Sequence, residues 1–376
     1  MNLRTIVVRK IEEIPPKDWL AVFPHVLENY YFFKTLDESS IDQFSLSYIM
    51  VYDGDTPIGA TSCFLMRFPL HITVTGFLRK FYEGLNKIFH DLLTPRVLMC
   101  GLPMGQGRIG VRGEPARVIE VIRVALDEIA SREKASLIIF KDFVAAYDSL
   151  LAPLTKRGFS KIESLPSTGM KISWKSFDEY LKSLSRVSRD GLKRKYKKTD
   201  AAVKIECEEL GALDESTVSE VYGLYMQTFI KLDMGFEKLT PEFFRHVSVN
   251  MPREVKYFLW RIDGKLVTFA LGLVSGDYFI DYYLGFDYGV AHEYNLYFIR
   301  FRDLLRWCIR NGIAYYEMGV TTYEPKRRLG FDFIRLYFYM KHRNRFINFF
   351  FGFFSHFFKP ENFDSVFDDM EEEKPS

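Results

Sequence analysis

Two stretches of the chain show the same alternation of hydrophobic and polar residues around an Asp-Gly pair. In the first, Ser45–Tyr52 alternates up to Asp53-Gly54, and a second apolar run follows the turn. In the second, Lys256–Ile262 leads into Asp263-Gly264, and again an apolar run follows. Alternation with a period of two on both sides of an Asp-Gly turn predicts a β-hairpin. The pattern therefore predicts two hairpins, one in each half of the chain.

After each hairpin the pattern changes to strand, helix and strand. The second of the two helices ends at Asn311-Gly312, a sequence typical of a helix C-terminus. A hairpin followed by these elements predicts an α/β fold with a mixed sheet. The predicted segments are Val97–Cys100, Pro115–Ser131 and Ser136–Phe140 in the first half, and Tyr278–Phe286, Leu296–Arg310 and Ile313–Met318 in the second.

The repetition predicts a duplicated fold with two domains in tandem. A chain of 376 residues is longer than one hydrophobic core usually supports. We expect an N-terminal domain at 1–165, a C-terminal domain at 171–345 and, at 346–376, a Phe-rich segment with an acidic tail. The alternative is that two unrelated halves share a common α/β pattern.

Composition narrows the class of protein. The net charge is +2, so bulk electrostatics does not favour nucleic-acid binding by the chain as a whole. The 4 Cys form no C-x-x-C pair and no H-E-x-x-H sequence occurs, so we expect buried thiols and no metal. We find neither a secretory signal nor a run of about 18 apolar residues. We therefore expect a cytoplasmic protein, with peripheral membrane association as an open alternative.

Several motifs of the second half match a known family. They are Leu284-Gly285-Phe286-Asp287, Asn311-Gly312, Tyr316-Glu317-Met318-Gly319, the stretch from Tyr323 to Gly330 with its Tyr-x-x-Lys, and the entry segment Phe177–Leu181 with Ser185, Arg189 and Leu192–Lys195. This half resembles the C-terminal half of the FemAB-like and BioF2-like acyltransferases, which belong to the GNAT (acetyltransferase) superfamily. The similarity is clear over Trp174–Met340, whereas the first half matches by topology only.

The resemblance implies a fold, an activity and the reactants. The fold is α/β, with two tandem GNAT-like domains, each a mixed, mostly antiparallel sheet flanked by helices. The activity is N-acyl transfer from an acyl-CoA or aminoacyl-tRNA donor to an amine of a small molecule or peptide, such as a cell-envelope or peptidoglycan-type precursor. Acyl-CoA would be a donor substrate, and no metal is implied. Two alternatives stay open: a non-catalytic GNAT-fold binding or scaffold protein at the membrane face, and an RNA-binding adaptor.

Three residues near the end of the second half are candidates for catalysis. Glu317 lies at the C-terminal end of a predicted strand, where α/β folds bind ligands, and its carboxylate can accept a proton from an attacking amine, directly or through water. A salt bridge with Arg327 or Arg328 is the alternative. Tyr323 either supplies a proton to a leaving thiolate or packs as an aromatic ring. Lys326 is expected to be exposed and to bind a phosphate or carboxylate of the acceptor.

A glycine-rich loop in the first half is the candidate donor site. It lies between a predicted strand and a predicted helix, where backbone N–H groups and the helix N-terminus favour a pyrophosphate. Two arginines can neutralise the phosphate charge. The alternative is a flexible surface loop, and the matching loop of the second half contains only Gly289. The candidate cofactor-binding residues are Gly105, Gly107, Arg108, Gly110, Arg112 and Gly113.

The predicted helix Tyr180–Lys198 carries a dense run of basic residues. Such a run can attract RNA, an anionic lipid surface or a nucleotide-linked substrate, unless it is simply a solvated helix face. We expect Arg189, Arg194 and Asp287 to contact the substrate. A second unusual stretch, Phe64–Leu93, reads as an amphipathic insertion. The Phe-rich segment Arg345–Phe358 and the part Gly76–Leu93 of this insertion form either an interfacial membrane contact or part of the core.

Overall fold

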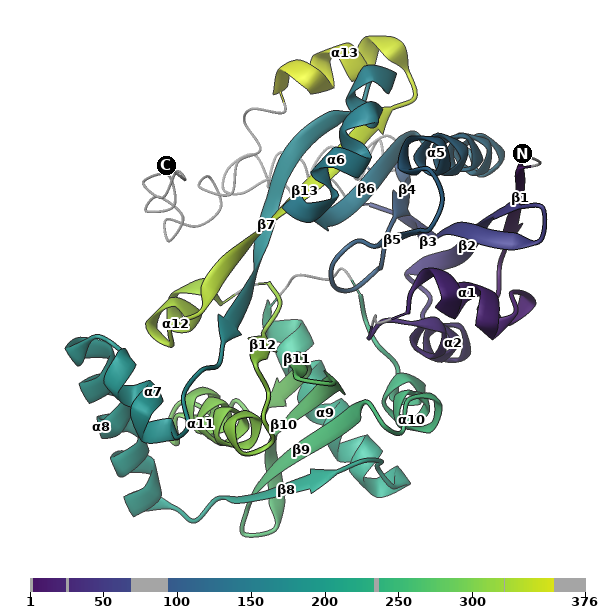
Figure 1. The fold of residues 1–376 in the computed structure, drawn as a ribbon. Helices are drawn as coiled ribbons and strands as arrows, with labels where there is room; N and C mark the ends of the chain where they lie inside the picture. Colours follow the sequence, from purple (N-terminus) through teal and green to yellow (C-terminus); the bar gives the residue numbers. More distant parts are fainter. Residues whose placement is uncertain (1–2, 25–26, 69–93, 233–236, 321, 355–376) are drawn as a thin grey trace. The chain divides into compact units, whose positions relative to one another are not determined.

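The computed structural model describes residues 3–24, 27–68, 94–232, 237–320 and 322–354 (Figure 1). The predicted insertion Phe64–Leu93 begins within a described strand, Thr56–Arg67, and from residue 69 onward it lies outside these residues, as does the acidic tail. The chain forms two compact units, and each contains segments from both halves of the sequence. Unit 1 consists of Met1–Tyr30, Ile41–Leu165 and Arg335–Ser376, and unit 2 of Tyr31–Ser40 and Pro166–Ile334.

Unit 1 is built on a mixed sheet. The strand order is β1 (Leu3–Val8), β2 (Phe44–Asp53), β3 (Thr56–Arg67), β4 (Arg96–Cys100), β6 (Leu137–Val144), β13 (Asp332–His342) and β7 (Ser160–Lys171), with β5 (Ile109–Val111) beside β3. Strands β4 and β6 are parallel, and the helix α5 (Pro115–Arg132) joins them. The predicted hairpin at Asp53-Gly54 is the antiparallel pair β2–β3.

Unit 2 repeats this arrangement of strands and helix. Its order is β7, β12 (Tyr315–Glu317), β11 (Tyr278–Phe286), β10 (Lys265–Ser275), β9 (Val255–Ile262) and β8 (Glu206–Leu210). Strands β11 and β12 are parallel, and α11 (Leu296–Arg310) joins them. The predicted second hairpin is β9–β10, where Asp263 and Gly264 have φ of +48° and +79°. Two positive φ values fit the tight hairpin turn that Asp-Gly favours.

The remaining helices divide between the two units. In unit 1 they are η1 (Ile11–Glu13), α1 (Pro16–Val22), η3 (Ala145–Tyr147), α6 (Asp148–Leu151), η4 (Ala152–Arg157) and α13 (Arg345–Phe354). In unit 2 they are α7 (Phe177–Ser183), α8 (Arg186–Ala202), α9 (Glu215–Leu232), α10 (Pro241–Asn250) and α12 (Tyr323–Arg328), joined by most of α2 (Tyr30–Glu38).

Successive side chains of a strand point to opposite faces of the sheet, and this explains why helices pack on both faces of strands such as β2 and β9. In β2, Ile49 belongs to the apolar cluster that includes α5, whereas the neighbouring Tyr48 packs edge-on against Trp19 of α1. In β9, Phe258 packs against Trp307 of α11, and the hydroxyl of Tyr257 donates to the carbonyl of Phe244 in α10. Successive side chains of a strand point to opposite faces, so near-continuous apolar strands require helices on both sides.

The two units do not follow the predicted ranges 1–165 and 171–345. One segment of the first range belongs to unit 2, and the end of the second range belongs to unit 1. Residues 31–40 belong to unit 2, where the hydroxyl of Thr240 donates to the carbonyl of Ser39 at 2.6 Å and Phe32 packs against Phe243. From Arg335 onward, β13 belongs to unit 1 and pairs with β6. The predicted mixed sheets flanked by helices are therefore present, but a strand from the end of the chain completes the first of them.

Two neighbouring glycines give opposite predictions for stability. A Cβ on Gly285 of β11 would lie 2.6 Å from backbone atoms of Leu224 and Tyr225, whereas nothing lies within 4 Å of a Cβ on Gly223 in α9. We expect Gly285→Ala to destabilise unit 2 by about 1–3 kcal/mol through overpacking. Gly223→Ala should stabilise it by about 0.5–1 kcal/mol through helix propensity. Urea unfolding of both variants measures this, and equal effects of the two substitutions would contradict the close packing of α9 on β11.

Candidate functional site

The parallel strands of unit 2 separate at their carboxyl ends. They pair only from Tyr278–Tyr315 to Ile280–Glu317, after which β11 continues to Phe286. Beyond β12 the chain is held instead by β7, since the N–H of Met318 donates to the carbonyl of Thr168 at 2.9 Å. The carboxyl ends of parallel strands are where α/β folds bind their ligands. The end of β12 is therefore the candidate site.

Glu317 occupies the end of β12 as a buried carboxylate. Ser167 donates its hydroxyl to Glu317 Oε1 at 2.8 Å, and the hydroxyl of Tyr278 donates to Oε2. The alternative partners, Arg327 and Arg328, both pair with Glu324. Two hydroxyl donors hold the carboxylate in one orientation and leave it able to accept a proton. This environment fits the predicted role of Glu317 as a base, which stays a prediction.

The predicted exposure of Lys326 is wrong, because its side chain is only 3% exposed. Its Nζ donates to the carbonyls of Met318 at 2.8 Å, Gly319 at 3.0 Å and Val320 at 3.2 Å. One turn of α12 thus directs the amine back at the loop that follows Glu317. Burial lowers the pKa of Lys326 to about 7, although the carboxylates of Asp281 and Glu317 favour its charged form. The amine can therefore change its charge near neutral pH.

Tyr323 lies in the same short helix with its ring buried. Its hydroxyl donates to the carbonyl of Pro166 at 2.9 Å, and its ring packs edge-on against Phe333. These contacts favour the packing role over proton donation to a leaving group. The structure thus brings Glu317, Tyr323 and Lys326 to one end of β12, with a different task for each.

Sequence reasoning missed a buried ion pair beside these residues. Arg300 of α11 is completely buried, and its Nη1 donates to Oδ2 of Asp281 in β11 at 2.5 Å. Tyr316 donates its hydroxyl to the same oxygen at 3.0 Å. Charged residues in an apolar strand and on the apolar face of a helix are rare unless paired. That signal, visible in the sequence around Asp281 and Arg300, could have identified the pair.

The glycine-rich loop of unit 1 is packed closely against its neighbours. A Cβ on Gly107 would lie 2.1 Å from the carbonyl oxygen of Lys141, and one on Gly110 would lie 2.4 Å from Val22. The N–H of Gly107 donates to Asp142, and the N–H groups of Arg112 and Gly113 donate to Ile58. Amides that already donate to carbonyls are not free to bind a pyrophosphate. Packing therefore explains these glycines, and a donor site at this loop stays a prediction.

Two further candidates, Arg108 of this loop and Asp287 of the substrate set, have local partners. Arg108 pairs with the buried Glu28 at 3.3 Å, while Gly105 and Arg112 are exposed. Asp287 pairs with Lys265 at 2.6 Å and accepts from the N–H of Gly289, and Lys265 in particular lowers the pKa of Asp287. These contacts fix a surface turn after β11. Binding of a substrate by Asp287 stays a prediction that they do not favour.

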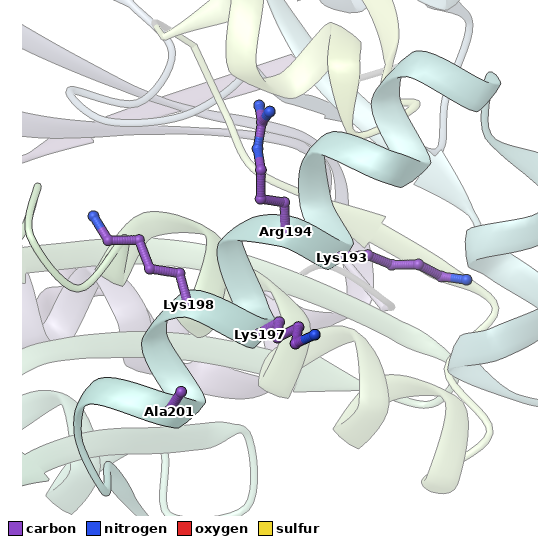
Figure 2. Close-up of a pocket in the computed structure, with 5 residues that line it drawn as sticks. All are labelled: Lys193, Arg194, Lys197, Lys198 and Ala201. Atoms are coloured by element: carbon purple, nitrogen blue, oxygen red, sulfur yellow. The ribbon is translucent and has the colours of Figure 1, made fainter.

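The basic residues of α8 form a cationic face. Lys193, Arg194, Lys197 and Lys198 are exposed and, with Ala201, line an open hollow of about 490 Å³. Figure 2 shows the four basic side chains spreading outward from successive turns of the helix. Within the described part of the chain none of the four forms an ion pair, whereas Arg189 lies 3.9 Å from Asp190. We call these four residues the cationic face.

The described residues contain no metal-binding group and no membrane-spanning helix. No cluster of three or more His, Cys, Asp or Glu among them could hold a metal ion. None of the helices in the same residue ranges is long and apolar enough to cross a bilayer. In α13, Phe346 and Phe349 are 83% and 76% exposed, and the residues after Phe354 lie outside the described part. The predicted contact with an anionic membrane stays a prediction.

Lys326→Met should change how stability depends on pH. Between the folded pKa of about 7 and the usual 10.5, the unfolded chain binds one more proton than the folded chain. The free energy of unfolding therefore rises with pH in this window. From pH 7 to 10 the wild type should gain about 4 kcal/mol relative to the variant.

Urea unfolding at a series of pH values measures this difference, and below pH 7 it should be constant. Lys182→Met, at an exposed lysine of α7, is the control and should leave the pH dependence unchanged. A difference between wild type and Lys326→Met that stays constant up to pH 10 would show that Lys326 remains charged in the fold.

Known proteins resemble this chain in sequence or in fold. A protein of Mycobacterium tuberculosis, provisionally named 8-amino-7-oxononanoate synthase 2, is 26% identical over 333 residues, which are 83% of this chain and 42% of that protein. The chain thus spans less than half the length of this curated relative. FemX superposes with a TM-score of 0.58 at 12% identity, over 94% of this chain and 100% of FemX.

Two further solved structures agree with this fold. L-PGS from Bacillus licheniformis has a TM-score of 0.52 at 12% identity, covering 88% of this chain and 93% of its own. The tandem GNAT protein from the clavulanic acid biosynthesis pathway has a TM-score of 0.51 at 10% identity, covering 91% and 98%. At such identities the likeness concerns the fold alone, and it confirms the predicted tandem GNAT architecture.

The family model for FemAB-like proteins, described as peptidoglycan biosynthesis/recognition, matches residues 103–349. This range is more than half of the chain and contains every motif of the second half that carried the resemblance. The family model and the superposed structures confirm the predicted FemAB-like resemblance and the predicted tandem GNAT fold. The chain belongs to the FemAB-like family.

Proposed function

We propose that the protein transfers an acyl or aminoacyl group to an amine, and that the reaction takes place at the end of β12 in unit 2. The observation that carries the proposal is the buried amine of Lys326, directed at the loop that follows the buried carboxylate of Glu317. Burying a titratable group costs free energy, and groups with strongly shifted pKa values cluster at functional sites. The carboxyl ends of parallel strands are also where α/β folds bind their ligands.

The residues at this site suit the chemistry of acyl transfer. The nitrogen of the acceptor amine forms a bond to the acyl carbon, and the carbon–sulfur or carbon–oxygen bond to the donor breaks. Glu317 would accept the proton that the nitrogen loses, while Ser167 and Tyr278 keep its carboxylate in place. The ammonium of Lys326 already donates its three N–H groups to carbonyls, so it would stabilise the negative charge that develops on the carbonyl oxygen through its field and not by a direct hydrogen bond. The leaving thiolate or alkoxide then takes up a proton from solvent, and Glu317 returns its proton to solvent.

The family suggests where the acceptor comes from. The description of the FemAB-like family is peptidoglycan biosynthesis/recognition. We therefore propose that the acceptor is an amine on a cell-envelope precursor. For the donor, an acyl-CoA and an aminoacyl-tRNA both present an activated carbonyl next to a phosphate-rich group. The name of the Mycobacterium tuberculosis relative adds no reactant, because the match covers only 42% of that protein.

The cationic face of α8 favours the polyanionic donor. Four exposed cations within two turns of one helix repel one another, and a chain of phosphates would neutralise them together. A single CoA carries its phosphates at one end only. We therefore propose that the cationic face binds the backbone of an aminoacyl-tRNA, with an anionic lipid surface as the second candidate.

Glu317→Gln and Lys326→Met should each abolish most of the transfer activity. The assay offers a panel of acyl-CoAs and aminoacyl-tRNAs together with amine-bearing envelope precursors, and detects the new amide by mass spectrometry. Loss of a general base or of charge stabilisation reduces such rates by about 100-fold or more. Lys182→Met is the matched control and should keep full activity. Transfer that persists in both variants would place the reaction elsewhere in the chain.

Neutralising the cationic face should weaken binding to tRNA in a salt-dependent manner. A variant with Lys193, Arg194, Lys197 and Lys198 changed to Gln should lower the slope of log K against log salt by about 3, because each phosphate contact releases a counterion. Filter binding of the full chain to unfractionated tRNA measures the slope. Lys175→Gln/Lys182→Gln is the control. If only binding to vesicles of phosphatidylglycerol changes, then the face binds lipid and not RNA.

A further inference from the structure

The ion pair of Asp281 and Arg300 joins three elements of unit 2 at the candidate site. Arg300 is 0% and Asp281 6% exposed, and one carboxylate oxygen of Asp281 accepts from both Arg300 and Tyr316. Through this oxygen α11, β11 and β12 are linked. The catalytic steps proposed above make no use of the pair.

The pair leaves several buried polar atoms unsatisfied. Within the described part of the chain, Arg300 Nε, Arg300 Nη2, Asp281 Oδ1 and the hydroxyl of Tyr297 have no hydrogen-bond partner. Unsatisfied buried atoms cost free energy, and apolar residues of similar volume often stabilise a fold better than a buried ion pair does. Stability alone therefore does not account for charges at these positions. Because the pair is surrounded by apolar side chains, its field acts strongly on charged neighbours.

Lys326 is one of those neighbours. Tyr316, which binds Asp281, stands two residues before Met318 in the chain, and the carbonyl of Met318 accepts from Lys326 Nζ at 2.8 Å. The Asp281 carboxylate raises the pKa of Lys326, the Arg300 guanidinium lowers it, and Glu317 raises it. On α12 itself the charged side chains are Glu324, Arg327 and Arg328, which pair with one another at the surface. The charges that face the amine thus come from β11, α11 and β12.

We propose that Asp281 and Arg300 are positioning residues for Lys326, and that their two charges act in opposite directions on its buried amine. The pair acts through Lys326 and touches no reactant. Its meaning for catalysis rests on the proposed function, whereas its control of the charge on Lys326 does not.

The test is a titration of Lys326 in the full chain. The protein is labelled with ¹³C and ¹⁵N in lysine, the Lys326 signal is assigned by its loss in Lys326→Arg, and its midpoint is followed by NMR. Asp281→Asn should move the midpoint to lower pH by about one unit, a tenfold loss of proton affinity, because only the guanidinium remains. Arg300→Gln should move it to higher pH.

Opposite shifts are the decisive result, because a purely structural pair would lower stability without moving the midpoint in two directions. Asp281→Glu and Arg300→Lys keep the charges and should leave the midpoint at its wild-type value. If one single-site variant does not fold, the other still has to shift in its own direction. Shifts of the same sign, or no shift, overturn the proposal. If the two variants shift the midpoint in opposite directions but the protein has no transferase activity, then Asp281 and Arg300 do control the charge of Lys326 and the proposed function is wrong.

Discussion

Each unit depends on one pair of parallel strands within a sheet whose other described pairings are mostly antiparallel. A tight turn cannot join parallel strands, so the chain has to cross the sheet through a helix. That helix is α5 between β4 and β6, and α11 between β11 and β12. The crossover buries an apolar helix face against the sheet and brings both carboxyl ends to the same edge. The position of the candidate site follows from this connection.

The charges at this edge lie in a core that is unusually aromatic. Tyr316 is stacked on Phe301 at 6.2 Å and packs edge-on against Phe331 at 5.4 Å. In such surroundings water cannot screen Asp281, Arg300 or Lys326, and each needs a specific partner. The carbonyls after β12 serve Lys326, and the carboxylate of Asp281 serves Arg300. The loop after Glu317 therefore depends on the buried amine of Lys326 for its conformation. The same amine is the charged group that the proposed reaction uses.

The two units use the equivalent edge differently. In unit 1, Lys141 pairs with Asp142 at 2.6 Å, and Asp142 has a φ of +57° and accepts from Ser164 at 2.6 Å. The N–H of Gly107 donates to the carbonyl of Asp142, and Lys141 Nζ donates to the carbonyl of Gly105 at 3.5 Å. In unit 2 the loop after β12 is held by Lys326 and Thr168, whose side chains both donate to the carbonyl of Gly319. Both loops are thus held in part by a lysine, but in unit 1 that lysine also pairs with a neighbouring carboxylate, whereas Lys326 donates to carbonyls alone.

The sequence by itself determined the repeated elements of this protein. Both Asp-Gly hairpins, both crossover helices and the family follow from local patterns, because turn chemistry, helix spacing and motif order depend on nearby residues. The position of Glu317 at the end of a strand followed in the same way. Only the tertiary structure decided which segments complete each sheet, since the pairing of β13 with β6 depends on residues far apart in the chain. It also decided the burial of Lys326 and its meeting with Asp281 and Arg300, because a lysine beside a proline looks exposed until the strands that enclose it are in place.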